Sequence, residues 1–328
     1  MKEIYLAGGC FWGAEHYFRN IEGVVDSEVG FANGNIPDPT YEQVYTDTTG
    51  YAETVRVIYD PERLPLAELL RAYFIAIDPL SVNKQGEDEG TRYRTGVYYT
   101  DSEDFIPVSR VFEEVRAALG VPLAVELEPL RNFYPADERH QDYLVKNPGG
   151  YCHLPLKLFR YPKLLSDLKA LLGDEKDLIA RLANIAALIK ERMGFFWVGF
   201  YLVGDADPSG HGHGGASEEG KELVLGPFQG PVACMRIGYD KGVCGTAWKE
   251  ARTLVVPDVE EFPGHIACSS LSKSEIVVPI CDGASGVIGV LDIDSTEPRT
   301  FDRIDAYWLE KIVSILGQGR FLGWGTLP

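Results

Sequence analysis

The stretch "LAGGCFWGAEHYF", residues 6–18, places a cysteine between a glycine pair and a Phe-Trp pair. The apolar run before it is typical of a strand, and "FWGAEHYFRNI" after it has the periodicity of a helix. Cys10 therefore stands at a strand-to-helix junction, where the helix dipole and free backbone N–H groups stabilise a thiolate. The alternative is a buried and inert cysteine, and this position alone does not decide between the two.

Short strands and helices continue to alternate outward from this junction. We expect helices at 13–20, 65–76 and 103–119, and strands in the runs "KEIYLA", "SEVGFAN", "ETVRVIYD" and "TGVYYT". Such a mixture is typical of an α/β or α+β domain.

A change of pattern near residue 160 divides the chain. From Pro162, leucines and isoleucines at helical spacing predict a pair of amphipathic helices, followed by the strand runs "WVGFYLV", "LVLGPF", "TLVVPDV", "SEIVVPI" and "GVIGVLDID". We therefore predict two domains, residues 1–157 and 158–328. The Gly-, Ser- and acid-rich segment 205–221 is expected to be a surface insert, and its His211 and His213 are not expected to bind a metal.

Composition and charge argue against several classes of partner. The formal net charge of −18 repels phosphate backbones, so no nucleic-acid partner is expected. No stretch approaches the roughly 18 apolar residues that cross a bilayer, and the first residues lack the pattern of a signal peptide. We therefore expect no membrane association and a cytoplasmic location. The six cysteines show no C-x-x-C spacing, so neither a disulfide framework nor a structural zinc site is predicted.

The strand in "YAETVRVIYDP" carries an acid on its core-facing side. Glu53 alternates with Val55, Val57 and Tyr59 and therefore shares one face with them. A carboxyl group on that face is desolvated, so its pKa should rise and it should donate a proton near neutral pH. The alternative is a strand-end glutamate that turns to solvent or pairs with an arginine.

Six motifs in the first half together resemble peptide methionine sulfoxide reductase of the A type. They are, in order, "GGCFWGAEHYF", "PTYEQV", "GYAETVRVIYDP", "NKQGEDEGTRYRTGVYY", "FYPADERHQDYL" and "NPGGYCHL". The resemblance runs from residue 1 to about 157, and it implies an α+β domain with a ferredoxin-like core.

This resemblance implies thiol-dependent reduction of methionine (S)-sulfoxide in proteins and in the free amino acid. Cys10 would be the nucleophile, Glu53 the acid that protonates the sulfoxide oxygen, and Cys152 the resolving cysteine of a two-cysteine relay. The substrate contacts would be Phe11 and Trp12 for the S-methyl group, Tyr41 and Tyr93 for the sulfoxide oxygen, and Asp88 in the lining of the site.

The second half contains a set of cysteines of its own. Cys234, Cys244 and Cys268 fall in loops or at a helix start, where thiols tend to be reactive. Cys281 ends an apolar strand and is expected to be inert.

Acidic residues of the second half are expected to cluster. Asp292 and Asp294 are two apart and therefore share a strand face. If "DGAS" is a four-residue hairpin loop, Glu275 lies opposite Asp292 and Cys281 opposite Gly286. Three neighbouring acids favour a cationic guest, either an ammonium group or a metal. The alternative is that an acid such as Asp294 caps the next segment.

The second half is similar to free methionine-(R)-sulfoxide reductase, a catalytic GAF domain with an antiparallel sheet flanked by helices. The similarity covers about 160 to 316 and includes "LVLGPFQG", "GVCGTA", "GHIAC" and "LDIDS". It implies that Cys268 is the nucleophile, Cys234 the main resolving thiol and Cys244 an auxiliary one. The substrate contacts would be Glu275, Asp292 and Asp294, the aspartates through the ammonium group, with Trp197 and Tyr201 on the apolar part. Phe196 departs from the asparagine common in the family, and the 205–221 insert is a second departure.

The two resemblances together imply a bifunctional enzyme, recycled by thioredoxin or a similar dithiol and using no cofactor or metal. A homodimer through the GAF half, with "LLSDLKALL" and 301–316 at the interface, is a further expectation. Two alternatives remain at this point. The second half could be a GAF module that senses a ligand or redox state, and the first half could be a general thiol peroxidase.

Overall fold

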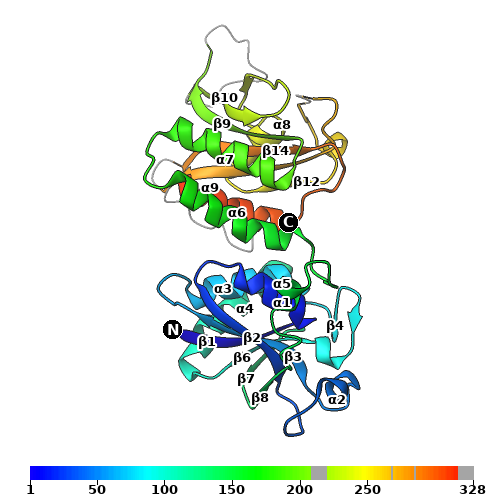
Figure 1. Cartoon of the computed structure of the whole chain (residues 1–328). Helices are drawn as coiled ribbons and strands as arrows, with labels where there is room; N and C mark the ends of the chain where they lie inside the picture. The colour runs from blue at the N-terminus through cyan, green and yellow to red at the C-terminus, as the bar shows by residue number, and fades with distance from the viewer. Residues whose placement is uncertain (208–219, 267–268, 284–285, 317–328) are drawn as a thin grey trace. The chain divides into compact units, whose positions relative to one another are not determined.

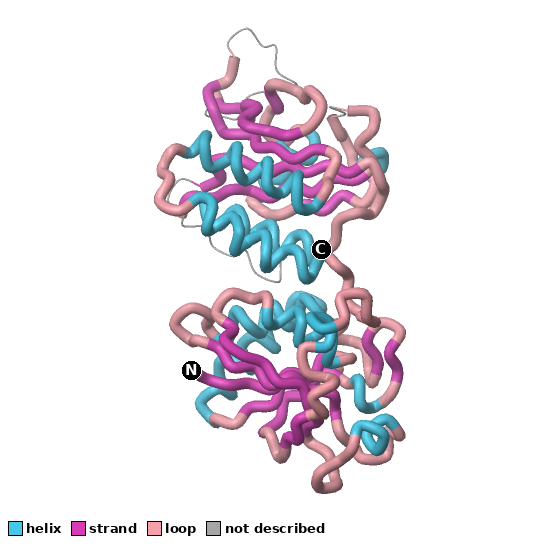
Figure 2. Tube along the Cα trace, in the orientation of Figure 1, coloured by secondary structure: helices cyan, strands magenta, loops and turns pink. Residues whose placement is uncertain are grey.

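The structure, a computed structural model, describes residues 1–207, 220–266, 269–283 and 286–316 (Figure 1, Figure 2). It divides into two compact units, Met1–Lys163 and Leu164–Pro328. The division falls inside helix α6 (Lys157–Leu172). This helix begins before Pro162, so the predicted start of the helix pair is corrected to Lys157. No helix in the described part of the chain is both long and apolar enough to span a bilayer.

The first unit is an α+β sheet domain. Its elements are β1 (Lys2–Gly8), α1 (Phe11–Arg19), β2 (Val24–Ala32), α2 (Tyr41–Tyr45), β3 (Ala52–Tyr59), α3 (Leu66–Ala76), β4 (Lys84–Gln85), β5 (Asp88–Glu89), β6 (Thr95–Tyr99), α4 (Phe105–Leu119), β7 (Glu126–Pro129), β8 (Phe133–Pro135) and α5 (Tyr143–Lys146). The strand order is β7-β6-β1-β3-β2-β8. Its central four strands, β6-β1-β3-β2, are antiparallel neighbours joined through α1 and α3 in a β-α-β-β-α-β sequence. This is the ferredoxin-like core that was predicted.

The turn between β1 and α1 is shaped by Gly9. Its φ of +80° lies in the left-handed region that favours glycine, and a Cβ added there would lie 2.7 Å from Gln85 Cβ. Cys10 follows directly as the N-cap residue of α1. The register Leu6↔Val55 between β1 and β3 brings Glu53 to the same end of the sheet.

The second unit is built on an antiparallel sheet, as predicted for a GAF domain. After α6 its elements are α7 (Leu178–Met193), β9 (Trp197–Asp205), β10 (Lys221–Gln229), β11 (Arg236–Ile237), α8 (Gly242–Glu250), β12 (Leu254–Val256), β13 (Ser274–Asp282), β14 (Gly286–Ser295) and α9 (Arg303–Val313). The strand order is β11-β10-β9-β14-β13-β12. Helix α8 packs on β13 and β14 on one face, and α7 and α9 cover the other (Figure 1).

The acids of the second unit lie on the face covered by α8. Val277 of β13 and Val290 of β14 belong to the same apolar cluster as Cys244 and Ala247 of α8. Because side chains alternate along a strand, the acids two residues from these valines point to the same face. The shared face predicted for Asp292 and Asp294 is therefore confirmed.

The predicted register of the β13–β14 hairpin is wrong by two residues. Glu275 pairs with Asp294 and Val277 with Asp292, and Cys281 lies opposite Val287. One residue of the shift arises because Asp282 and Gly286 are paired strand residues, which shortens the loop. The other arises from an irregularity between Ile280 and Cys281. A shift of two keeps every side chain on its face, so the acids still cluster.

Helix α7 offers a test of local stability. Asp177 is its N-cap, and its carboxylate accepts a hydrogen bond from Ala180 N–H at 2.8 Å. Asp177→Ala should lower the free energy of unfolding of the second unit by about 1 kcal/mol. Tryptophan fluorescence during urea denaturation reports this unit, because only Trp12 of the five tryptophans precedes residue 164. The exposed Asp174→Ala is the matched control, and an equal effect of both substitutions would contradict the capping role.

Candidate active sites

The first site forms where α1 begins against β3. Glu53 is 1% exposed, and its Oε2 accepts a hydrogen bond from Phe11 N–H at 3.0 Å. Burial raises the pKa of Glu53 to about 8, although the Phe11 N–H and Arg92 lower it by smaller amounts. The predicted inward-facing, proton-holding carboxyl group is thus confirmed. The hydrogen bond fixes it one residue away from Cys10.

The protonation state of Cys10 differs from the one predicted from the sequence. It is 5% exposed, and burial, followed by the charge of Glu53, raises the pKa of its thiol well above the ordinary value. The expectation that the helix start favours the thiolate is therefore wrong, because desolvation exceeds the effect of the helix terminus. At neutral pH Cys10 and Glu53 both hold protons in this arrangement.

Aromatic side chains line a pocket of about 450 Å³ at this site. Trp12 stacks on Tyr143 with ring centroids 3.9 Å apart, and Tyr41 stacks on His140 at 4.5 Å. The lining consists of Trp12, Tyr41, Glu42, Tyr45, Arg139, His140 and Tyr143. Phe11 is buried beside Phe31 at 5.8 Å and is not one of the lining residues. Because most of the lining is aromatic, the pocket suits an apolar group.

Two tyrosines are held as hydrogen-bond donors near the Cys10–Glu53 pair. Burial, with the charges of Glu53 and Cys10, raises the pKa of Tyr41 to about 12. The same causes, burial first, raise the pKa of Tyr93, which is also buried. Both phenols therefore remain protonated at neutral pH and can donate to an oxygen placed beside Glu53.

Cys152 lies against the first turns of α1. A Cβ added to Gly13 would lie 2.9 Å from Cys152 Sγ, so the thiol occupies the space left by that glycine. The next residue, His153, is buried, with Nδ1 3.7 Å from Asp88 Oδ2. Tyr151 O–H donates to the other oxygen of Asp88 at 2.9 Å. Asp88 thus holds the segment that carries Cys152, and its charge also raises the pKa of Cys10.

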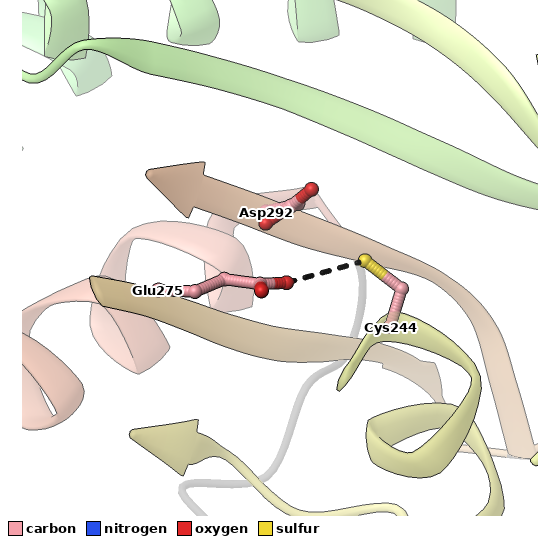
Figure 3. Close-up of side chains that lie close together, drawn as sticks. All are labelled: Cys244, Glu275 and Asp292. Carbon is pink, nitrogen blue, oxygen red and sulfur yellow. Dashed lines mark hydrogen bonds between the residues drawn. The ribbon is translucent and has the colours of Figure 1, made fainter. Parts of the chain in front are cut away.

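The second site is an acidic cluster between the sheet and α8 (Figure 3). Burial, followed by the neighbouring aspartates, raises the pKa of Glu275 well above its ordinary value, and burial together with Asp294 does the same for Asp292. Burial raises the pKa of Asp294 to about 6. Cys244 Sγ lies 3.9 Å from Glu275 Oε1. Three acids in one buried place repel one another when ionised, which favours a positively charged guest.

The predicted apolar contacts lie beside this cluster on β9. Asp294 pairs with Trp197 across the sheet, and Trp197 stacks with Tyr201 at 6.2 Å. Tyr201 O–H donates to the carbonyl of Cys234 at 3.0 Å. Cys268 lies outside the described residues. Its sequence neighbours Ile266 and Ser269 line two small hollows on either side of the aspartates.

Comparison with known proteins agrees with this division into two sites. The family model described as "Peptide methionine sulfoxide reductase" matches residues 2–168, just over half of the chain. The chain belongs to this family. A GAF domain matches residues 177–319 of the same reductase.

Among curated proteins, the reductase is similar to the peptide methionine sulfoxide reductase MsrA of Clostridium acetobutylicum. The two are 51% identical over 160 residues, which cover 49% of this chain and 99% of the relative. One similar solved structure is free methionine-R-sulfoxide reductase of Neisseria meningitidis with its substrate (47% identity, TM-score 0.42, 48% of this chain and 86% of that chain). Another is Mxr1 of Saccharomyces cerevisiae in reduced form (40%, 0.45, 46% and 88%).

Several residues of the reductase's first site were not predicted. Arg92 forms an ion pair with Asp47 at 2.6 Å and lies over the rings of Tyr45 and Tyr93. His140 accepts a hydrogen bond from the indole N–H of Trp12 at 3.3 Å. His140 and His153 both lie inside the motifs that carry the resemblance, so their presence there was the available signal. In the second site His265 was missed, although "GHIAC" contains it.

The position of the Cys152 thiol against Gly13 can be tested with Gly13→Ala. The added methyl would approach Cys152 Sγ to 2.9 Å, closer than real Cβ contacts, so the thiol must move outward. We expect alkylation of Cys152 by iodoacetamide, followed by peptide mass analysis, to become several-fold faster. Gly149→Ala is the matched control, because a Cβ there meets no atom within 4 Å. An unchanged alkylation rate in Gly13→Ala would contradict this position of the thiol.

Proposed function

We propose that the chain is a bifunctional methionine sulfoxide reductase. Residues 1–157 would reduce methionine (S)-sulfoxide in proteins and in the free amino acid, and residues 158–328 would reduce free methionine-(R)-sulfoxide. The observation that carries the proposal is the buried, proton-holding Glu53 fixed beside Cys10 at the start of α1. The two sulfur epimers of methionine sulfoxide each require their own enzyme. Two domains, one for each epimer, would therefore reduce both forms of the substrate.

The geometry of the first site supports a definite order of events. The thioether of the substrate enters the aromatic pocket, and its oxygen accepts hydrogen bonds from Tyr41 and Tyr93. Glu53 donates its proton to that oxygen, which makes the sulfur electrophilic. Cys10 then attacks the sulfur while its thiol proton passes to the Glu53 carboxylate. The sulfur–oxygen bond of the substrate breaks and the hydroxyl group passes to Cys10, so the products are methionine and a sulfenic acid on Cys10.

Cys152 would be the thiol that resolves this sulfenic acid. Its thiol displaces water from the Cys10 sulfenic acid and forms a Cys10–Cys152 disulfide. A dithiol reductant then returns both cysteines to thiols. The position of Cys152 against α1, close enough for its charge to act on the pKa of Cys10, supports this pairing.

The acids of the second site suit the ammonium group of a small zwitterionic substrate. Asp292 and Asp294 would bind that group, Glu275 would be a further substrate contact, and Trp197 and Tyr201 would contact the side chain. Cys268 would attack the sulfoxide, and Cys234, with Cys244 as an auxiliary thiol, would form the disulfide. The roles of the cysteines rest on the sequence resemblance, and those of the acids also on their burial and mutual repulsion.

The same proposal includes thioredoxin or a similar dithiol as reductant and a cytoplasmic location, where thiols stay reduced. A homodimer through α6 is part of it, since Leu171 of that helix is 52% exposed. Helix α9 contributes little to such an interface, because most of its side chains are buried.

Two variants of the full chain test the division of labour. Cys10→Ser should abolish reduction of protein-bound (S)-sulfoxide and retain reduction of free methionine-(R)-sulfoxide. Cys268→Ser should do the reverse, and Cys281→Ser should retain both activities. Chiral chromatography of the remaining sulfoxides measures each epimer. If the intact chain with dithiothreitol leaves the (R)-epimer untouched, the second half is a ligand-sensing module and the proposal fails for it.

The role of Glu53 predicts a pH dependence. Its donor form exists below a pKa of about 8, so kcat/KM for (S)-sulfoxide should fall as pH rises through 8. Glu53→Gln should lower the rate by about 10²–10⁴-fold and remove this alkaline decline. Hydrogen peroxide is the control substrate: peroxide turnover that persists in Glu53→Gln, without a Glu53-dependent loss of sulfoxide turnover, would favour a general thiol peroxidase.

A further inference from the structure

The acidic cluster of the second unit contains the donor atoms of a metal site. One ligand atom from each of Cys244, Glu275 and Asp292 lies within 4.8 Å of the others, and all three residues are buried. They come from three elements, α8, β13 and β14, and converge between them (Figure 3). The distance of 3.9 Å between Cys244 Sγ and Glu275 Oε1 is close to what two ligands of one small ion require.

One side-chain oxygen of Asp292 is left without a hydrogen bond in the described part of this cluster. The residue is 7% exposed, and among the described residues its Oδ1 is a buried atom with no hydrogen-bond partner. A buried carboxyl oxygen without a partner is costly. A cation placed among the three side chains would supply the missing interaction.

The mixture of donors selects the kind of cation. Thiolate and imidazole together with carboxylate suit Zn²⁺, whereas Mg²⁺ and Ca²⁺ prefer oxygen donors. The imidazole is His265, whose Nε2 lies 3.6 Å from Glu275 Oε2. The hollow that these residues line with Lys241 has a volume of about 20 Å³. That volume fits one water-sized guest and is too small for a whole amino acid.

We propose that Cys244, Glu275 and Asp292, with His265 at the edge, bind a thiophilic divalent cation such as Zn²⁺ that inhibits the second domain. Binding forms one metal–sulfur bond to Cys244, two metal–oxygen bonds to Glu275 and Asp292 and one metal–nitrogen bond to His265, and it releases the protons that the thiol and carboxyl groups carry. No electron is transferred. The inhibition rests on the proposed function, because the ion would occupy the place of the substrate's ammonium group.

Cobalt binding to the full chain tests the metal site itself. The protein is reduced with a phosphine, freed of reductant under argon and titrated with Co²⁺, which absorbs by thiolate-to-metal charge transfer when cysteine is a ligand. Zn²⁺ should displace the cobalt and abolish the band. Cys244→Ser should abolish it directly, and Asp292→Asn should weaken binding by at least about tenfold.

Matched controls separate this site from other thiols and histidines. Cys281→Ser should retain the band, because Cys281 is not a member of the cluster formed by the described residues. The double variant His211→Ala/His213→Ala, whose positions lie outside the described residues, should also retain it. Absence of the band in the unmodified chain, or its persistence in Cys244→Ser, would overturn the proposal. Circular dichroism of Cys244→Ser and Asp292→Asn verifies that both variants fold.

Inhibition is measured in single turnovers, because dithiol reductants bind zinc. In a reduced Cys10→Ser chain, Zn²⁺ should slow the formation of methionine from free methionine-(R)-sulfoxide, and excess substrate should restore the rate. If the (R)-sulfoxide is reduced equally fast with Zn²⁺, the inhibition is wrong and the proposed function stands. If it is not reduced even without Zn²⁺, the proposed function fails, and the cobalt band alone decides the metal site.

Discussion

The hydrogen bond from Phe11 N–H to the buried Glu53 carboxyl group holds the first site together. It joins the start of α1 to β3, and so it fixes the nucleophile candidate and the proton donor relative to each other. Its strength is modest, because a neutral carboxyl accepts more weakly than a carboxylate. The weaker hydrogen bond is compatible with the proposed mechanism, because that mechanism requires the protonated form of Glu53.

Both units use burial to keep acids protonated, but with different results. In the first unit the Glu53 carboxyl group is buried beside Cys10, and in the proposed mechanism it donates its proton to the substrate oxygen. In the second, Glu275, Asp292 and Asp294 share one buried place, where both aspartates raise the pKa of Glu275 and Asp294 raises the pKa of Asp292. A lone buried acid is suited to proton donation, whereas a group of them is suited to binding a cation.

Much of this arrangement could be predicted from the sequence, and the failures have physical causes. Strand alternation placed Glu53 in the core because the pattern of period two is independent of distant contacts. The β13–β14 register was wrong because neither the pairing of Asp282 with Gly286 nor the irregularity between Ile280 and Cys281 leaves a signal in composition. The predicted ionisation of Cys10 was wrong because desolvation depends on which residues cover the thiol. Strand β3 is distant from Cys10 in the sequence and lies beside it only in the folded chain. Residues such as His153 and Arg92 act through partners far along the chain, which a single sequence does not reveal.

The small volumes beside Asp292 and Asp294 decide how much of a ligand the acids can surround. The two hollows measure about 20 and 10 Å³, and the aspartates line both. Each holds about one water-sized group, so the acids would enclose only the charged end of a larger ligand. Discrimination between ligands that share this charged end would then depend on residues outside the hollows.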